Sequence, residues 1–364
     1  MESVGRLMYQ ELKETFRNRK VLVTGHTGFK GSWLCQWLLE LNADITGYAL
    51  DPYTDADNFV QTGLSSRIKD IRADVRDFDK LKSVMQEVKP EFVFHLAAQP
   101  LVLESYARPK DTLDINIGGS INVMEACRET ESVRVMVMIT SDKCYENKEW
   151  VWGYRENDPM GGFDPYSASK GAAEIVIAAY RNSFYNPSKF KLHGKALSSV
   201  RAGNVIGGGD WARDRIVPDC IKSLISGKSI EVRNPYSTRP WQHVLEPLGG
   251  YLHLAEMMYH DPIHYAGAWN FGPDLSSIRE VQDLVELIIE EWGSGQYHVS
   301  QQVEKPHEAK LLALDISKVR LNLGWKPTWD FEQTIKQTVA WYKGYCNKEE
   351  MAKLCQNQIK AFMS

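Results

Sequence analysis

Short apolar runs alternate with amphipathic stretches along the first half of the chain. The runs have the length of strands and are bounded by turn residues, whereas the stretches between them repeat with helical periodicity. We expect strands at 20–24, 44–50, 68–75, 91–98, 133–140 and 196–202, and helices at 33–41, 77–88, 110–131 and 165–185. This alternation predicts parallel β-α-β units, and the apolar character of the strands suits a sheet covered on both faces.

The second half is less regular. Residues 203–240 are rich in Gly and Pro, and helical patterns follow at 279–293 and 331–345. The segment 267–272 reads as a strand that returns to the main sheet. We therefore predict an α/β protein: a Rossmann-type doubly wound parallel sheet with a smaller, interleaved α/β substrate-binding domain. The expected boundaries are a cofactor domain at 15–205, rejoined by about 241–275, and a substrate domain at 206–240 and 276–350.

Composition narrows the class of protein. The chain has 364 residues, of which 43% are apolar and 25% are charged. Its net charge of -4 gives no excess of positive charge that would favour binding of nucleic acid. No run approaches the ~18 apolar residues of a membrane helix, and the polar N-terminus lacks a signal-peptide core. The six cysteines show no CxxC pair and no metal-ligand spacing. We expect a cytoplasmic protein with reduced thiols, no membrane partner and no metal.

A glycine-rich loop follows the first strand. Residues 24–31 read TGHTGFKG, which places Gly25, Gly28 and Gly31 between a strand and a helix. Glycine allows the tight turn and a close approach of the backbone to a pyrophosphate, and the helix N-terminus supplies N–H donors. Asp51 follows the second strand, where a carboxylate accepts ribose hydroxyls and repels a 2′-phosphate. The pattern predicts NAD rather than NADP; the alternative for Asp51 is a solvated turn residue.

Further cofactor contacts are expected around this loop and at the ends of the third and fourth strands. For Asp74 and Val75, an ordinary strand end is nearly as good an interpretation. The candidates are Thr27, Phe29, Asp74, Val75, Leu96, Ala97 and Ala98.

Tyr166 and Lys170 are four residues apart in a helical pattern and share one face. An ammonium beside a phenol stabilises the phenolate, so we expect a lowered pKa for Tyr166. Such a tyrosine takes a hydroxyl proton while a hydride leaves the adjacent carbon. The alternative is an amphipathic helix that carries Tyr and Lys by chance.

Ser141, Asp142 and Lys143 follow the fifth strand. Ligands and catalytic groups of open α/β sheets gather at the carboxyl ends of the strands. An Asp beside a Lys there is costly unless the two work or pair. Chemistry is favoured over a simple salt bridge because the Tyr166 helix and the end of the fourth strand converge on the same edge.

These motifs together resemble the extended short-chain dehydrogenase/reductase family, and within it the nucleotide-sugar 4,6-dehydratases. The resemblance runs from about residue 15 to 345 and rests on TGHTGFKG, LAAQP, DINIGG, SDK, YSASK and RAGNVIGGGDW. The family usually has Thr-Asp-Glu after strand five, whereas this chain has Ser141-Asp142-Lys143. Lysine at this position is typical of the branch that acts on CDP-glucose, so the resemblance implies CDP-glucose or a similar nucleotide sugar as substrate.

The resemblance also implies a lyase mechanism with bound NAD. Tyr166 takes the C4 hydroxyl proton as C4 is oxidised, and Ser141 hydrogen-bonds the same oxygen. A base then removes the C5 proton, protonated Asp142 donates to the departing C6 hydroxyl, and the hydride returns to C6. Lys143 is the base if neutral; if charged, it stabilises the enolate instead. The product, a 4-keto-6-deoxy sugar, serves deoxysugar synthesis for surface polysaccharide (O-antigen of lipopolysaccharide).

Substrate contacts follow from the same resemblance. Asn204 and Arg239 match residues that meet the diphosphate, and a guanidinium suits a diphosphate because it donates two bonds at once. For each candidate, an ordinary surface residue is nearly as good an interpretation. The candidates are Gln99, Ser105, Asn204, Arg215, Arg233, Arg239 and His307.

Asn116 is a poor helix former within the 110–131 pattern, and the family pattern assigns it to a water or a backbone kink near Lys170. In the family the helices near 110–131 and 165–185 pair two subunits, so a homodimer or homotetramer is expected.

Two other functions fit the same sequence. One is an NAD-dependent nucleotide-sugar epimerase, or a 4,6-dehydratase that acts on another nucleotide sugar. The other is a regulator that binds nucleotides without catalysis. Ser141-Asp142-Lys143 argues against a plain epimerase, and the Tyr166–Lys170 pair argues against a regulator.

Overall fold

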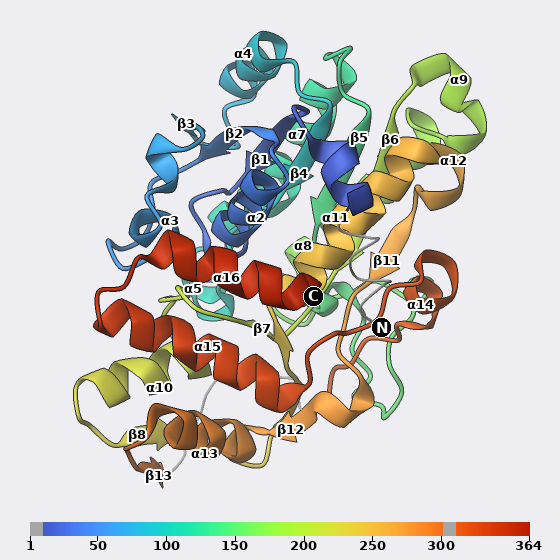
Figure 1. Cartoon of the computed structure of the whole chain (residues 1–364). Coiled ribbons are helices and arrows are strands. Elements are labelled where there is room, and N and C mark those ends of the chain that lie inside the picture. The colour runs from blue at the N-terminus through green and yellow to red at the C-terminus, as the bar shows by residue number, and fades with distance from the viewer. Residues whose placement is uncertain (1–9, 301–310) are drawn as a thin grey trace.

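A parallel seven-stranded sheet forms the centre of the computed structural model, which describes residues 10–300 and 311–364 (Figure 1). The strand order is β11-β6-β5-β4-β1-β2-β3. The chain builds the sheet outward from β1 in one direction and then from β4 in the other, which is the doubly wound arrangement predicted above. The bounds are β1 (Lys20–Thr24), β2 (Asp44–Ala49), β3 (Lys69–Arg72), β4 (Phe92–His95), β5 (Val135–Ile139), β6 (Ala196–Arg201) and β11 (Ala268–Asn270).

The predicted return of residues 267–272 to the main sheet is confirmed. β11 pairs in parallel with β6, with Trp269 opposite Val200. Segments before and after it lie outside the sheet, so the chain leaves the sheet and comes back to it. How the chain divides into a cofactor domain and a substrate domain stays a prediction.

Alternating strand residues fill two cores, one on each face of the sheet. Val21 and Phe92 point to the core that contains α2 (Phe29–Glu40) and α11 (Leu245–His260). Leu22 and Val93 point to the opposite core. That second core contains residues of α4 (Phe78–Val88), α7 (Gly119–Arg128) and α8 (Pro165–Ser183). Burial on both faces explains why the strands read as nearly continuous apolar runs.

The helix predicted at 110–131 is interrupted. α6 (Pro109–Leu113) passes into a π-helical turn at Asp114–Gly118 before α7 begins. Asn116 lies in this turn and is buried. The backbone kink expected at Asn116 is therefore confirmed.

Smaller pairs of strands and several helices follow the sixth strand. In Figure 1, α10, α13 and α15 lie below the sheet, together with β8 and β13. The strand pairs are β7 (Val205–Ile206) with β10 (Gln242–His243), β8 (Ile230–Val232) with β13 (Tyr297–Val299), and β9 (Thr238–Pro240) with β12 (Ile278–Glu280). The helices are α10 (Ile216–Ile225), α13 (Val281–Trp292), α14 (Ser317–Leu323), α15 (Phe331–Cys346) and α16 (Met351–Met363).

Short helices complete the chain, and α16 closes it against α2. The Phe362 ring of α16 packs edge-on against Trp37 of α2, with ring centroids 5.6 Å apart. The short helices are α3 (Asn58–Gln61), α5 (Val102–Ala107), α9 (Phe190–His193) and α12 (Pro262–Tyr265). Single 3₁₀ turns lie at Leu64–Ser66, Asp142–Cys144, Pro187–Lys189 and Leu275–Ser277.

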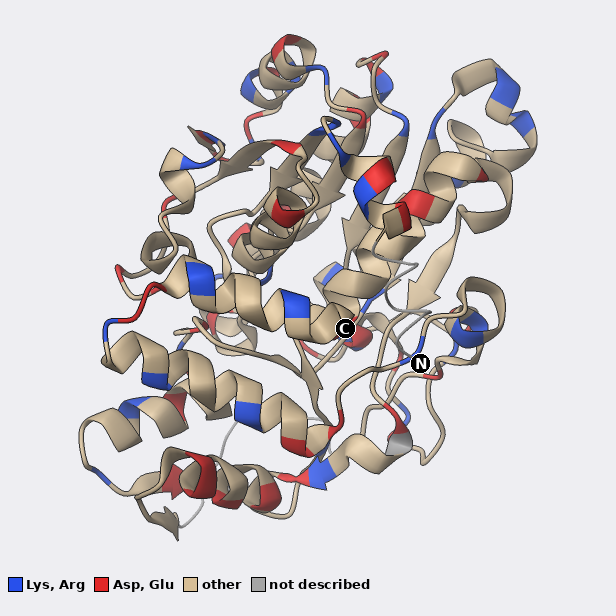
Figure 2. Cartoon of the chain, viewed as in Figure 1, with Lys and Arg blue, Asp and Glu red and all other residues tan. Residues whose placement is uncertain are grey.

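Charged residues of both signs are spread over the surface, and acidic residues gather on α13 (Figure 2). In the described parts of the chain, we find no helix with the length and apolar character needed to cross a membrane. All six cysteines are free thiols, as expected, and five of them are buried.

Candidate active site

The glycine loop packs so tightly that two of its glycines cannot carry a side chain. Gly25 has a φ of 74°, and a Cβ there would lie 2.6 Å from the backbone nitrogen of Ala97. A Cβ at Gly31 would lie 2.1 Å from the carbonyl oxygen of Gly25. The loop therefore holds the start of α2 directly against the carboxyl ends of β1 and β4. This is the switch point of the sheet, where open α/β folds bind ligands.

The residues around the loop fit a dinucleotide. Gly28 is the N-cap of α2 and has no side chain that could cap the first-turn N–H groups, which leaves them for an anion. Thr27 donates a hydrogen bond to the carbonyl of Leu50 at 3.0 Å and so ties the loop to the end of β2. The Asp51 side chain is 88% exposed, with its carboxylate 3.9 Å from Arg72. It is therefore open to ribose hydroxyls.

The other predicted cofactor residues lie along the same edge. Ala97 follows β4, and its N–H donates to the Thr24 hydroxyl at 3.3 Å. Asp74 forms an ion pair with Arg76 at 2.6 Å, and Val75 is buried. Phe29, Leu96 and Ala98 are partly buried around the loop. Their contacts with a cofactor stay predictions.

Ser141 and Asp142 form a hydrogen-bonded pair just past β5. The Ser141 hydroxyl donates to Asp142 Oδ1 at 2.9 Å and accepts from the Lys143 N–H at 3.3 Å. Ser141 and Asp142 are buried, whereas Lys143 is partly buried. A Cβ at Gly203 would lie 1.8 Å from Asp142 Oδ2, so the glycine makes room for the carboxylate.

The start of α8 is fixed by two hydrogen bonds. Asp164 caps the helix by accepting from the Ser167 N–H at 2.9 Å, and Pro165 occupies the first turn. The backbone N–H of Tyr166 donates to the Ser105 hydroxyl at 3.2 Å. Tyr166 and Lys170 are both buried, and the Tyr166 phenol interacts with the Ser141 side chain. The structure thus brings together the pairs that the sequence placed on β5 and α8.

The protonation of Tyr166 differs from the sequence expectation. Burial raises the pKa of Tyr166 to about 12, and its interaction with Ser141 only partly opposes this. Burial also lowers the pKa of Lys170 to about 8, although Glu174 acts in the opposite direction. The expected lowering of the Tyr166 pKa is wrong, because loss of hydration outweighs the opposing effects of Ser141 and Arg215.

A buried ion pair beneath the site was missed from the sequence. Glu174 lies one turn after Lys170 on α8 and pairs with Arg201 of β6 at 2.7 Å. It also accepts from Ser199 at 2.8 Å and from Thr140, the residue before Ser141. A carboxylate four residues after the lysine of YSASK was a usable signal, because it repeats the same helix face.

The predicted substrate residues differ in how they are linked to the catalytic groups. Arg215 pairs with Asp210 at 2.7 Å, and its charge interacts with Tyr166, so it belongs to the site. Asn204 has a φ of 50° and lies between β6 and β7, and Arg239 lies in β9. The Arg233 side chain is 44% exposed, with Asp214 at 3.9 Å and Glu231 at 3.8 Å. His307 lies outside the described residues.

Gln99 and Ser105 are buried supports of the site. The Asn116 side chain bonds both backbone polar groups of Gln99, at 2.9 and 3.1 Å, and donates to Ser169 Oγ at 2.8 Å. The π-helical turn therefore links the end of β4 to the residue before Lys170. The Ser105 hydroxyl donates to Val102 and accepts from Tyr166. Direct contact of Gln99 or Ser105 with a sugar stays a prediction.

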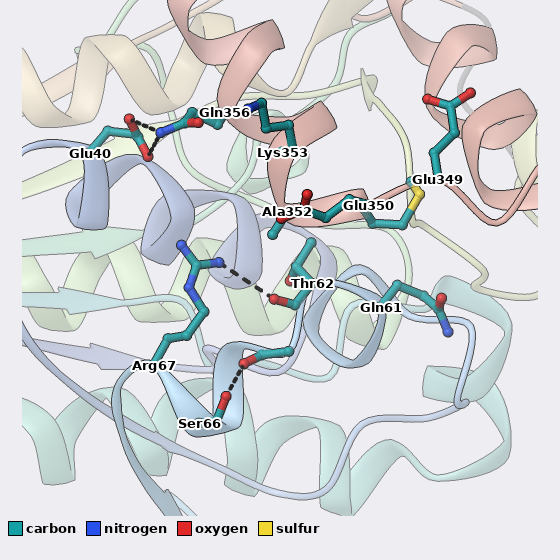
Figure 3. A pocket seen from close by; sticks show the side chains of 12 residues that line it. Glu40, Gln61, Thr62, Ser66, Arg67, Glu349, Glu350, Ala352, Lys353 and Gln356 are labelled. Carbon is teal, nitrogen blue, oxygen red and sulfur yellow. Dashed lines mark hydrogen bonds between the residues drawn. The ribbon is translucent and has the colours of Figure 1, made fainter.

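A separate cavity of about 540 Å³ lies between α16 and the end of α2 (Figure 3). Gln356 of α16 reaches across it to the Glu40 carboxylate at 2.8 Å, and Arg67 donates to the carbonyl of Thr62. None of the predicted site residues lines this cavity. The chemistry assembled at the sheet edge is thus distinct from it.

Comparisons with known proteins agree on one family. A family model described as GDP-mannose 4,6 dehydratase matches residues 22–338. The CDP-glucose 4,6-dehydratase of Salmonella typhimurium is 47% identical over 352 residues, which cover 97% of this chain and 98% of that protein.

Solved structures share the fold. The dTDP-glucose 4,6-dehydratase of Bacillus anthracis, in complex with NAD, has a TM-score of 0.72 at 19% identity and covers 92% of this chain and 99% of its own. The UDP-glucose 4-epimerase of Thermotoga maritima, solved with UDP-glucose, has a TM-score of 0.73 at 21% identity and covers 90% and 99%. At these identities the likeness concerns the fold.

Proposed function

This chain belongs to the 4,6-dehydratase family of the GDP-mannose 4,6 dehydratase model, and from that premise we propose that it dehydrates CDP-D-glucose to CDP-4-keto-6-deoxy-D-glucose. The observation that carries the substrate is the 47% identity, over nearly the full length of both chains, to a CDP-glucose 4,6-dehydratase. The geometry supports the chemistry, because the Tyr166 phenol, the Ser141 hydroxyl and the buried Asp142 carboxyl group meet at one sheet edge.

The cofactor is NAD. When bound, it would supply a hydride acceptor for C4 of the sugar and the hydride donor for C6, so that the cycle would leave it unchanged. Gly25 and Gly31 allow the tight turn that would bring the loop backbone close to its diphosphate, and the first turn of α2, with Gly28 as the N-cap, would offer N–H donors. Asp51 accepts hydrogen bonds from the ribose.

Tyr166 removes the proton of the C4 hydroxyl. Its phenol lies beside the Ser141 side chain, which hydrogen-bonds the same sugar oxygen. Burial disfavours the phenolate, so Tyr166 needs positive charge nearby to act as a base. Arg215 provides such a charge from the chain, and Lys170, one turn along the helix, is the second cation that we propose for this role.

Asp142 and Lys143 serve the elimination of water. Asp142 in its protonated form donates to the departing C6 hydroxyl, and its hydrogen bond from Ser141 fixes its orientation. Lys143 removes the C5 proton if it is neutral. If it is charged, it stabilises the negative oxygen that develops at C4.

The diphosphate of the nucleotide sugar needs cations at the same edge. Arg215 supplies one from the start of α10, and Arg239 supplies another from β9. Asn204 lies between β6 and β7, and its side-chain amide is a further donor.

A second copy of the chain is the proposed partner. Leu113 of α6 is 38% exposed and Ile175 of α8 is 61% exposed, and these two helices pack against each other. A second copy of the chain that covers this helix pair would remove both apolar side chains from water. We propose a homodimer or homotetramer through this face, with closed symmetry. The free thiols suit the reducing cytoplasm, where we propose that the protein works.

An assay with purified protein tests the function. CDP-glucose and NAD⁺ are supplied, and the alkaline absorbance of a 4-keto-6-deoxy sugar is followed, with UDP-, GDP- and dTDP-glucose in parallel. We expect product from CDP-glucose. Product from another nucleotide sugar alone would support the dehydration and contradict CDP-glucose as the substrate. An epimer formed without loss of water would favour an epimerase.

A further inference from the structure

Lys30 is a cation at the mouth of the site that the mechanism above does not use. It is the second residue of α2 and is partly buried. Trp33 and Leu34, three and four residues later on the same face, are completely buried, and Trp33 donates to the carbonyl of Gly208 at 2.9 Å. Lys30 therefore lies on the side of α2 that faces the 203–210 segment.

That segment carries charges close to Lys30. Phe29 packs against Gly207, where a Cβ would lie 3.1 Å from its ring. Asp210 ends the segment and pairs with Arg215 at 2.7 Å. The Lys30 charge interacts with the charges of Asp210 and Arg215, as well as with those of Asp142 and Lys170. Lys30 thus reaches into the space between the glycine loop and the catalytic groups.

The Lys30 ammonium has no protein partner there. Within residues 10–300 and 311–364 it makes neither a hydrogen bond nor an ion pair, whereas Asp210 is engaged by Arg215 and Asp142 by Ser141. Burial, with Arg215 and Lys170 adding to it and Asp142 and Asp210 opposing it, lowers the pKa of Lys30 to about 8. A cation that is partly desolvated beside other cations needs an anion.

We propose that Lys30 is a diphosphate-binding residue of the active site. Both molecules that the proposed function brings to this edge, the dinucleotide and the nucleotide sugar, carry a diphosphate. Lysine binds phosphate oxygens as a point charge, and the N–H groups of the first turn of α2 lie beside it. Binding of the nucleotide-sugar diphosphate by Lys30 rests on the proposed function, whereas binding of the cofactor diphosphate requires only that NAD⁺ binds.

Binding measurements on the full-length protein test this role. The dissociation constants of NAD⁺ and of CDP are measured by titration for wild type, Lys30→Met and Lys30→Arg. Adenosine and cytidine, which carry no phosphate, are the ligand controls. Lys20→Met is the protein control, because this exposed lysine lies at the opposite end of β1 from the glycine loop.

We expect Lys30→Met to weaken at least one of the two diphosphate ligands by about tenfold or more, which corresponds to 1.4 kcal/mol. Lys30→Arg should stay within about threefold of wild type, because the charge is kept, and the nucleosides and Lys20→Met should show no change. A change confined to NAD⁺ identifies the cofactor diphosphate as the partner, and one confined to CDP identifies that of the substrate.

Two results would overturn the role. One is a Lys30→Met protein that binds NAD⁺ and CDP as wild type does, even if its turnover falls. The other is an equal loss of affinity for the phosphate-free nucleosides. Failure of the wild type to dehydrate CDP-glucose would instead remove the proposed function and leave the NAD⁺ measurement valid.

Discussion

Tyr166 and Lys170 are the residues whose chemistry depends most on their surroundings. Their spacing is legible in the sequence, but their burial is not, and burial reverses the expected direction of the Tyr166 pKa. The residues that the sequence missed, Lys30 and Glu174, share a reason. Lys30 lies within TGHTGFKG, which was interpreted through its glycines, and Glu174 lies one turn after YSASK, which was interpreted through its tyrosine and lysine.

The Tyr166 hydroxyl is expected to act in proton transfer rather than in binding. We expect Tyr166→Phe to reduce kcat by about 10²- to 10⁴-fold, because a positioned acid or base contributes a factor of this size. Affinity for NAD⁺ and CDP should remain. Steady-state kinetics and titration check this, with Tyr53→Phe as the control because Tyr53 is 83% exposed. A variant that retained its kcat would remove Tyr166 from the proton step.

Lys143 is the residue with two possible roles, as base or as charge stabiliser. If Lys143 is the base, Lys143→Met should abolish exchange of the C5 hydrogen with deuterated solvent at every pH tested. The exchange is followed by mass spectrometry of the product and of the residual sugar. Undiminished exchange in the variant would contradict the base role and leave Lys143 as the cation beside the C4 oxygen.

Tertiary packing explains which elements could not be predicted. The strands of the main sheet and α8 agree with the sequence within a few residues, since their patterns are long and regular. α11 contains Pro247 and the pair Gly249-Gly250, which are loop signals. A Cβ at Gly250 would lie 2.2 Å from the Phe271 ring, so close packing, not flexibility, requires glycine there. Such contacts cannot be read from local propensity.

Glu246 links two elements and makes stability depend on pH. It lies at the start of α11 and accepts from the backbone N–H groups of Thr328 at 3.0 Å and Trp329 at 2.7 Å. Burial raises its pKa from 4.5 to about 8. Between these two values the folded protein keeps the proton and the unfolded chain loses it. The stability that Glu246 contributes is therefore complete below pH 4.5 and falls as the pH rises toward 8.

Glu246→Gln should remove this dependence. Relative to wild type, the free energy of unfolding of the variant should increase by up to about 1.4 kcal/mol per pH unit between pH 4.5 and 8. Urea unfolding at several pH values measures the difference, and Glu332→Gln, an exposed residue in the first turn of α15, is the matched control. Parallel stability curves for wild type and Glu246→Gln would show that the buried carboxyl group does not hold the proton.

For the molecule as a whole, the sequence and the structure agree mainly in the topology of the sheet. The order of the seven strands follows from alternating strands and helices, and it places the ends of β1, β4 and β5 at one edge. The glycine loop and the two catalytic pairs meet there for that reason. The placement of Arg215 near Tyr166 was not predictable, because it depends on the irregular 203–240 segment.

The exposed face of α6 and α8 is expected to join two copies of the chain. We predict that wild type has the mass of a dimer or a tetramer by light scattering and that Ile175→Lys shifts it toward a single chain, because a charge would be buried in an apolar contact. Leu192→Lys is the control, since Leu192 is 83% exposed and lies on α9, outside these two helices. Wild-type assembly that survives Ile175→Lys would place the interface elsewhere.

We expect this chain to move a hydride within one sugar while it removes water. CDP-glucose deuterated at C4 tests it most directly, with the position of the label in the product read by NMR and mass spectrometry. We expect deuterium at C6 of CDP-4-keto-6-deoxyglucose, with no net reduction of NAD⁺. Deuterium retained at C4 of an epimer, or transferred to NAD⁺ that then accumulates in its deuterated reduced form, would show that the hydride is not returned to C6.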